Sequence, residues 1–390
     1  MKRGRILIVT QMYPSGSTGT SVKTLYTIRF LAKEGFIIDI CCPHYHKMVK
    51  IPLTISGVTI YPFEKQTTGK FSFAYLLRAW KSLFSWKPFR VAKLYDRVID
   101  TTIQALRTQH RYDYIFFDGF STIQYTKMLD ESHIYIDDED ITDLMWQRTL
   151  TTPNYLLRIF YAIEWMKCLL YERIFFRRVK EIWAISPNTK KRLQALSNAK
   201  TSLMPTIVPS HQNVFHNQSK HIIFSGLLSW QENVVGLKWF LANCWDTIHA
   251  SLPDTHLYIT GQMADQDFAQ YIKMFPHVTL LGFIPNLTSV YNRCALAIAP
   301  IFTNAGIKVK ILTYLSFGLP VVANAEATWG MTSTDGIILS EKNQFTDSII
   351  HLLADQNLRT SLSKKGKNNM TLHHSEKSLR TFFTQRGILV

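Results

Sequence analysis

The stretch GIKVKILTYLSFGLPVV occupies residues 306–322 and decides the fold assignment of this chain. Apolar residues recur through it at helical spacing, and Gly318 and Pro320 end the helix before the apolar run LPVVA. The segment therefore predicts a glycine loop, an amphipathic helix and a buried strand in succession.

Two lysines, Lys308 and Lys310, fall in the first turn of this predicted helix. The helix dipole disfavours cations there, so their position needs an explanation. Free backbone N–H groups, close approach at Gly306 and two ammonium groups together would bind a diphosphate. The alternative is a solvated pair of lysines on an ordinary amphipathic helix.

Short β-branched runs alternate with helical patterns on both sides of this segment. The strand-like runs lie at 5–10, 36–42, 58–62, 112–117, 133–137 and 181–186, and then at 221–226, 256–261, 278–282, 295–300, 319–324 and 336–340. Such alternation predicts an α/β protein with mostly parallel sheets covered by helices. Two series of strands predict two doubly wound, Rossmann-like domains with the ligand site in a cleft between them.

A polar stretch without periodicity, residues 206–220, separates the two series. We therefore expect an N-terminal domain over 1–205 and a C-terminal domain over 206–374. His373 and His374 are expected on an exposed tail.

Composition and net charge restrict the class of protein, its binding partners and its cellular location. The 390 residues are 46% hydrophobic and 18% charged, which excludes a disordered chain. The net charge of +16 is concentrated in residues 1–200, which carry 30 basic and 17 acidic side chains. Such a charge favours anionic partners. Five scattered cysteines and the lack of a signal peptide or a spanning apolar run predict a cytoplasmic protein.

Two basic segments are rich in aromatic residues. Eight Lys or Arg residues and one acid lie between Lys65 and Arg97 among eight Phe, Tyr and Trp residues, and 155–178 repeats the pattern with a basic end. Cations beside aromatic rings suit an anionic membrane surface. They also suit single-stranded nucleic acid, but no nucleic-acid-binding motif accompanies them. The remaining alternative is that these segments only form a basic, amphipathic surface of the first domain.

The sequence resembles the GT-B glycosyltransferases, most closely the family-four group that uses nucleotide sugars. The resemblance rests on 306–322 and on RILIVTQMYPSGSTGT, YIDDEDITD, EIWAISPNTKKRL, FSGLLSWQENVVGLKWFL and GFIPNLTSVYNRCALAIAP, in the family's order over some 350 residues. It implies a GT-B architecture, with the donor in the C-terminal domain and the acceptor in the N-terminal one. It also implies that the last helix, 375–390, packs back on the N-terminal domain.

Position by position, the resemblance implies a set of donor-binding residues. They are Gly19, Thr20, Gly226, Asn233, Gly306, Lys308, Lys310, Thr313 and Glu326. The family's two glutamates are replaced by Ala305 and Thr313, neither of which accepts two hydrogen bonds as a carboxylate does. This departure leaves open an inverting, glucuronosyltransferase-like enzyme and a non-catalytic GT-B-like membrane partner.

Carboxylates that follow strands are the candidate catalytic bases. Asp140 matches the D-x-x-D position of the family, and Asp118 follows a strand in FFDGF. A helix cap or a solvated acid is the alternative for each of them. No cofactor and no metal ion are expected.

The resulting expectation is an enzyme that transfers a hexose from a nucleotide diphosphate sugar, with retention, to a lipid-linked glycan. The acceptor would be a surface polysaccharide or lipopolysaccharide precursor. The protein would lie on the inner face of the cell membrane and would bind no nucleic acid.

Overall fold

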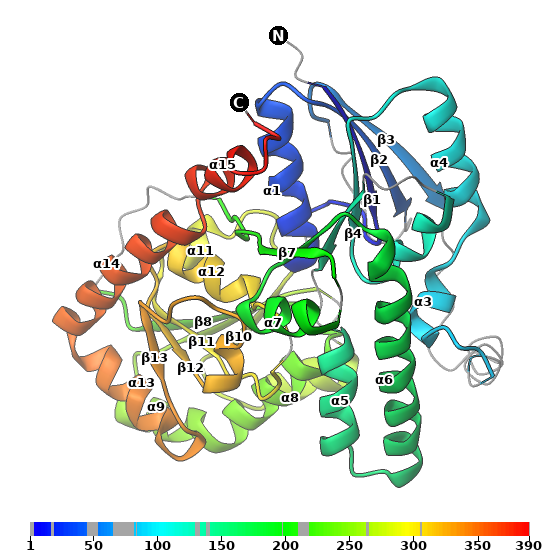
Figure 1. The fold of residues 1–390 in the computed structure, drawn as a ribbon. Coiled ribbons are helices and arrows are strands. Elements are labelled where there is room, and N and C mark those ends of the chain that lie inside the picture. Colours follow the sequence, from blue (N-terminus) through cyan, green and yellow to red (C-terminus); the bar gives the residue numbers. More distant parts are fainter. Residues whose placement is uncertain are drawn as a thin grey trace. The chain divides into compact units, whose positions relative to one another are not determined.

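The computed structural model describes residues 4–16, 19–44, 54–64, 82, 84–128, 133–137, 141–196, 198–209, 218–262, 265–304 and 306–389 (Figure 1). The chain forms two compact units: Met1–Gly16 with Thr20–Met204, and Ser17–Gly19 with Pro205–Val390. Each unit has its own parallel sheet and its own buried apolar core. The predicted α/β class with two doubly wound domains is confirmed. The packing of 375–390 on the N-terminal unit stays a prediction.

The sheet of the N-terminal unit has seven strands in the order β3-β2-β1-β4-β5-β6-β7, and every neighbouring pair is parallel. The strands are β1 (Arg5–Thr10), β2 (Ile37–His44), β3 (Val58–Glu64), β4 (Tyr114–Asp118), β5 (His133–Asp137), β6 (Glu181–Ala184) and β7 (Lys200–Leu203). The helices are α1 (Gly19–Lys33), α3 (Phe89–Leu94), α4 (Arg97–Gln109), α5 (Ile141–Thr151), α6 (Tyr155–Phe175) and α7 (Pro187–Leu196).

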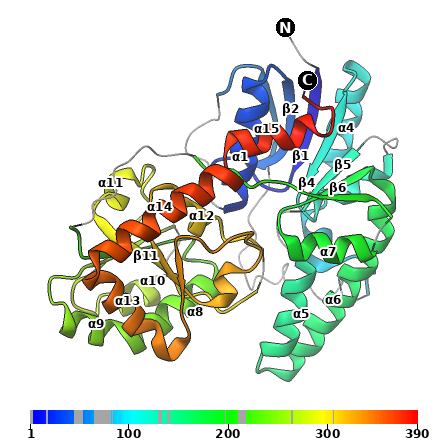
Figure 2. The ribbon, with the colours of Figure 1, turned by 60° about the vertical axis from the view of Figure 1, so that its left-hand side comes forward.

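The sheet of the C-terminal unit has six strands in the order β10-β9-β8-β11-β12-β13, again all parallel. The strands are β8 (His221–Ser225), β9 (Leu257–Thr260), β10 (Val278–Gly282), β11 (Cys294–Ala299), β12 (Val321–Ala323) and β13 (Ile337–Leu339). The helices are α8 (Gln231–Phe240), α9 (Asp246–Ser251), α10 (Gln266–Ile272), α11 (Thr288–Tyr291), α12 (Val309–Ser316), α13 (Phe345–Ala354), α14 (Gln356–His373) and α15 (Glu376–Thr384) (Figure 2).

The strand β11 shows why the sequence pattern predicts most of the strands. All six residues of CALAIA are buried, because helices cover both faces of a parallel sheet. A strand of this kind is a continuous apolar run and is easily recognised. By contrast, β7 has the sequence KTSL and was missed, since it is short, polar and at the sheet edge.

Two further details differ from the sequence prediction. Helix α12 begins one residue later than expected, so Lys308 is its N-cap and only Lys310 lies in the first turn. His374 is buried, with 5% of its surface exposed, and its Nδ1 lies 2.8 Å from the carbonyl oxygen of Thr206. Burial lowers the pKa of His374 to about 4. The expectation of an exposed tail at His374 is therefore wrong.

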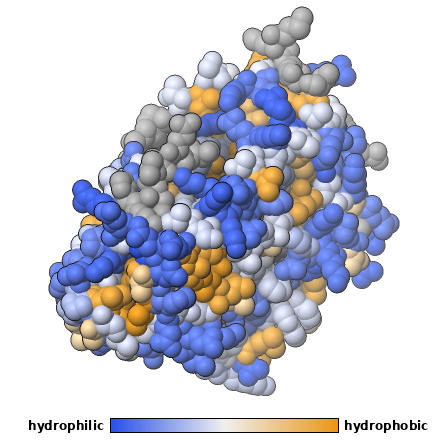
Figure 3. All heavy atoms as spheres, turned by 90° about the vertical axis from the view of Figure 1, so that its left-hand side faces the viewer, coloured by the Kyte–Doolittle hydropathy of each residue, from blue (hydrophilic) through white to orange (hydrophobic). Residues whose placement is uncertain are grey.

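The described surface is polar and carries separate apolar patches. Figure 3 shows hydrophilic residues over much of one face, with smaller hydrophobic areas between them. None of the helices in the described ranges is both long enough and apolar enough to cross a membrane.

Each sheet has one point where the strand order reverses. In the N-terminal unit this switch point lies between β1 and β4, and in the C-terminal unit it lies between β8 and β11. Ligands of open parallel sheets bind beyond the carboxyl ends of the strands at such points. The fold therefore directs attention to the residues that follow these four strands.

Candidate active site

The switch point of the C-terminal unit brings together several of the sequence-predicted residues. Gly226 directly follows β8, and Gly306 and Lys308 lie in the loop between β11 and α12. Lys310 in α12 and Asn233 in α8 complete the cluster, since their side chains are hydrogen-bonded. Residues from three segments, up to 84 positions apart, thus meet at one edge of the sheet.

Lys310 is the centre of this cluster. Its Nζ donates to Asn233 Oδ1 at 2.7 Å and lies 4.1 Å from the centre of the Phe224 ring. The Asn233 amide in turn donates to the carbonyl oxygen of Leu227 at 2.7 Å, which fixes the orientation of the asparagine. The ammonium group is therefore held between an amide oxygen and an aromatic face.

Two glycines make room for this arrangement. A Cβ atom at Gly226 would lie 2.6 Å from Lys310 Nζ, so a side chain at that position would displace the amine. Gly306 has φ +60°, a conformation that L side chains rarely adopt, and its carbonyl oxygen accepts from Lys308 Nζ at 3.1 Å. The sequence predicted both glycines, and the geometry gives each one a physical reason.

No carboxylate among the described residues pairs with Lys310. Burial and the nearby positive charge of Lys308 lower the pKa of Lys310 to about 7. The protonated amine is thus held in a site that disfavours its charge. An anion placed there would remove this cost, and the free N–H groups of the α12 N-terminus would add to its binding.

A polar network that the sequence pattern did not predict lies beneath this cluster. The Tyr314 hydroxyl accepts from the Ser225 amide N–H at 2.7 Å and donates to the Ser225 carbonyl at 3.2 Å. The Tyr291 hydroxyl lies 2.9 Å from Ser225 Oγ. These bonds join the end of β8 to α12. Tyr314 could have been noticed as a tyrosine on an otherwise apolar helix face, because a buried tyrosine hydroxyl needs a partner.

The remaining donor-side predictions lie on neighbouring elements. Thr313 Oγ1 donates to the carbonyl oxygen of Val309 at 3.0 Å, so its hydroxyl is bonded within its own helix. Glu326 lies in the short helix after β12, and its carboxylate accepts from Asn324 Nδ2 at 2.5 Å. Asn324 also bonds both backbone groups of Ile301, which ties the loop after β11 to the end of β12.

The N-terminal unit has a different polar centre at its switch point. Asp118, at the end of β4, is 2% exposed, and its Oδ1 accepts from Lys23 Nζ at 2.6 Å. Its second oxygen accepts from the Thr24 hydroxyl. Both donors come from α1, which begins at Gly19 and Thr20. The carboxylate that was predicted as a base is therefore engaged on both oxygens, while the donor roles of Gly19 and Thr20 stay predictions.

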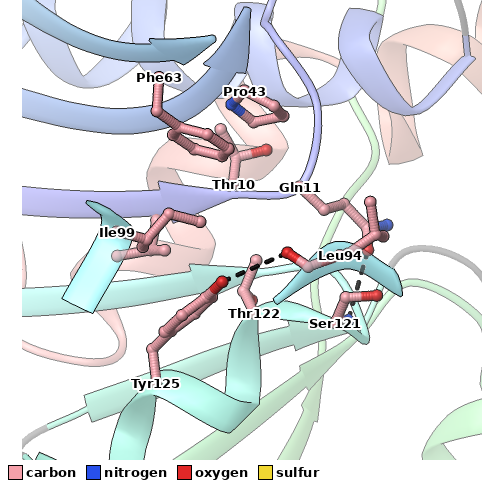
Figure 4. Close-up of a pocket in the computed structure, with 10 residues that line it drawn as sticks. Thr10, Gln11, Pro43, Phe63, Leu94, Ile99, Ser121, Thr122 and Tyr125 are labelled. Atoms are coloured by element: carbon pink, nitrogen blue, oxygen red, sulfur yellow. Dashed lines mark hydrogen bonds between the residues drawn. The ribbon is translucent and has the colours of Figure 1, made fainter. Parts of the chain in front are cut away.

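A small pocket lies beside this centre at the carboxyl ends of β1, β2 and β3 (Figure 4). Its volume is about 10 Å³, room for roughly one water molecule. The lining residues are uncharged and include Gln11, Phe63 and Tyr125. Gln11 Nε2 and the hydroxyl of Ser121, which also lines the pocket, are buried without a hydrogen-bond partner.

Two sequence-predicted positions cannot be placed. Asp140 and Ala305 lie outside the described residues. Among the residues that are described, no three His, Cys, Asp or Glu side chains are grouped so that they could hold a metal ion. The expectation of a metal-free, cofactor-free enzyme stays a prediction.

Comparisons with known proteins bear on the family and the fold. Residues 219–355 match the family model of glycosyl transferases group 1. This range contains Gly226, Asn233, Lys308 and Lys310. The search of curated proteins finds no match.

Three solved structures show the extent of the structural similarity. Sucrose-phosphate synthase from Thermosynechococcus elongatus is 12% identical, with 98% of each chain covered and a TM-score of 0.73. WaaG, described as a glycosyltransferase involved in lipopolysaccharide biosynthesis, is 12% identical, with 99% of each chain covered and a TM-score of 0.66. Anabaena HepE, solved with UDP and glucose, is 11% identical, with 98% of this chain and 99% of HepE covered and a TM-score of 0.63.

Residues 219–355 of the chain match the group 1 glycosyltransferases, and the whole chain has the GT-B fold of the solved structures. The resemblance seen in the sequence is thereby confirmed for the fold, and for the family over residues 219–355. The two switch points differ in electrostatic character. At one, Lys310 has no paired acid among the described residues, and at the other, Lys23 is paired with Asp118.

We predict that Asp118→Asn lowers the free energy of unfolding by about 3–5 kcal/mol, because Lys23 is then left buried without its counter-charge. Urea unfolding measures this change. The double variant Lys23→Met, Asp118→Asn should recover part of the loss. An Asp118→Asn protein that is as stable as the wild type but has lost transferase activity would instead identify Asp118 as a catalytic base.

We also predict that the affinity for UDP falls as the pH rises from 7.5 to 9, by up to about tenfold per unit. Lys310, with its pKa lowered to about 7, must take up a proton to bind the diphosphate as a cation. UDP itself is fully ionised over this range. Calorimetric titration measures the affinity, and Lys310→Arg should remove the pH dependence. The same slope in Lys310→Arg would contradict the assignment.

Proposed function

We propose that this glycosyltransferase moves a sugar from a nucleotide diphosphate sugar to a lipid-linked glycan at the inner, cytoplasmic face of the cell membrane. The product would be a precursor of a surface polysaccharide or lipopolysaccharide. The observation that carries the proposal is the pair Lys308 and Lys310 at the α12 N-terminus, with no carboxylate paired to Lys310 in the described part of the chain.

The donor diphosphate is the ligand that fits this place. It offers negative charge to Lys308, to Lys310 and to the amides at the start of α12. Gly226 and Gly306 allow a close approach, and Asn233 orients the amine. We assign no metal ion to the site, because the two lysines supply the positive charge that a departing diphosphate requires.

We propose transfer with retention of the anomeric configuration. Stabilising and positioning the leaving group suffices for such a reaction, whereas inversion needs a free base for the acceptor hydroxyl. Asp118 is not free, since Lys23 and Thr24 hold both of its oxygens. Asp140 is the remaining candidate for the inverting alternative.

The N-terminal unit is the proposed acceptor side. The residues around its pocket are uncharged, a setting that suits sugar hydroxyls and ring faces better than phosphate, although the pocket itself has room for only about one water molecule. Gln11 and Ser121 offer hydrogen-bonding groups that are unpartnered in this structure. The lipid part of the acceptor accounts for the excess of basic residues in the N-terminal half.

A thermal-shift panel of UDP, GDP, ADP, CMP and dTDP tests the donor site. We expect one nucleotide to raise the melting temperature of the wild type, because a ligand that binds only the folded state stabilises it. The variant Lys308→Ala, Lys310→Ala should lose the shift. Lys364→Ala, Lys365→Ala, which removes two exposed lysines of α14, should keep it.

No shift with any nucleotide in a folded sample would contradict the donor site. The non-catalytic GT-B-like membrane partner would then be the better description.

The reaction is tested with the labelled nucleotide sugar that the panel selects and a lipid extract of the source cells. We expect label to enter the organic phase, because the acceptor is lipid-linked, and NMR of the released glycan to show the anomeric configuration of the donor. Heat-inactivated protein is the control. An inverted linkage would disprove retention, and label only in free sugar would disprove the lipid-linked acceptor.

A further inference from the structure

The helical hairpin α5–α6 of the N-terminal unit presents an apolar face to solvent. Figures 1 and 2 show the hairpin extending beyond the sheet of this unit. On α6, Leu156, Ile159, Met166 and Leu170 have 75%, 42%, 60% and 47% of their surfaces exposed. Their spacing of three, seven and four residues places them along one side of the helix. Nothing in the described part of the chain covers this stripe.

The stripe continues into a basic end. Arg173 and Arg177 follow at the same spacing and are exposed. All charged side chains between Ile141 and Lys180 that are exposed are basic, namely Arg158, Arg173, Arg177, Arg178 and Lys180. The hairpin thus combines an apolar stripe with positive charge only.

The three acids of the hairpin all have basic partners: Asp143 is half-buried, and its carboxylate lies 3.3 Å from Arg192, while the other two are buried. Glu164 is buried and bonds Lys167 at 2.9 Å. Glu172 is buried and accepts from Arg192 at 2.6 Å and from Thr142 at 2.7 Å. The positive charge of the outer surface is therefore not balanced locally.

The other helix of the hairpin, α5, and the residues before α3 add exposed apolar and aromatic side chains. Trp146 and Leu150 of α5 are 42% and 57% exposed. Phe84 is 78% exposed, and Trp86 stacks on Phe175 near the end of α6, with ring centres 6.1 Å apart. Aromatic side chains beside cations are typical of helices that lie at the headgroup level of a bilayer.

We propose that the α5–α6 hairpin is the membrane-docking element and that α6 lies along the surface of an anionic bilayer. Its stripe from Leu156 to Leu170 enters the acyl boundary, and Arg173 and Arg177 contact lipid phosphates. A second copy of the chain is the competing occupant. It would bring two basic surfaces together without an exposed acid in the described residues 141–180 to pair with them, whereas an anionic bilayer matches both the charge and the apolar stripe.

This inference rests on the proposed location at the membrane and names the surface that contacts the bilayer. Helix α6 is 21 residues long, or about 30 Å. It carries charged residues along its whole length, so it suits a helix lying on the bilayer. Docking through this hairpin holds the N-terminal unit, the proposed acceptor side, next to lipid-linked glycans.

Flotation with vesicles tests the docking. The probes are vesicles of phosphatidylcholine with 30% phosphatidylglycerol and vesicles of phosphatidylcholine alone. We expect the full-length protein to float with the anionic vesicles only. Leu156→Gln, Met166→Gln should reduce the bound fraction at least tenfold, because two apolar side chains no longer leave water. The matched control Met274→Gln, Leu372→Gln changes residues that are 75% and 69% exposed in the C-terminal unit, and should bind as the wild type.

The charges are tested separately. Arg173→Gln, Arg177→Gln should lower vesicle binding by roughly 20-fold, since each arginine near an anionic surface contributes about a fivefold change. Binding that is equal for neutral and anionic vesicles, or equal in both hairpin variants and the control, would overturn the proposal. Light scattering that shows a dimer converted to a monomer by Leu156→Gln, Met166→Gln, without vesicle binding, would assign the stripe to a second copy.

The nucleotide shift of the same variants keeps the two proposals apart. It should be unchanged in Leu156→Gln, Met166→Gln, because the hairpin is not part of the donor site. Loss of vesicle binding with an intact nucleotide shift isolates the docking role, while a wild type that binds vesicles but no nucleotide would contradict the donor site alone.

Discussion

The site in the C-terminal unit depends on an amine, that of Lys310, held where a positive charge is costly. Its amine is at the first turn of a helix, beside Lys308 and over an aromatic ring, and no carboxylate in the described residues offsets it. The neighbouring residues either reduce this cost or leave space for the amine. Asn233 turns its oxygen toward the amine, and Gly226 has no side chain to displace it. A site built this way favours an anion over water.

Buried hydrogen bonds hold the elements that carry this site in fixed positions. The Tyr314 hydroxyl bonds both backbone groups of Ser225, so α12 cannot move relative to β8 without breaking buried hydrogen bonds. Asn324 fastens the end of β12 to the loop after β11 in the same manner. Preorganisation of this kind matters for a leaving-group site, because positive charge that is already in place needs no rearrangement during the reaction.

The sequence predicted most of the fold because parallel strands buried on both faces are continuous apolar runs, as in β11. It could not reveal β7, whose sequence KTSL has no apolar signal, or the burial of His374 against Thr206, which are 168 positions apart. In the site, Lys308 and Lys310 were visible because they break the rule for charges at helix N-termini. Tyr314 and Asn324 were not, because their roles depend on partners that only the folded sheet brings near.

The two switch points offer unlike environments to a ligand. At β4, Asp118 neutralises Lys23, and the adjoining pocket is lined by uncharged residues. At β8 and β11, Lys310 has no such partner among the described residues. A diphosphate therefore gains more from the environment of Lys310 than from that of Lys23, whose charge is already paired. A saccharide carries hydroxyls and apolar ring faces. It loses less binding free energy at the β4 switch point, because it displaces no ion there. Under the proposed function, the acid-free Lys310 therefore favours the donor in the C-terminal unit, and the acid-paired Lys23 favours the acceptor in the N-terminal unit.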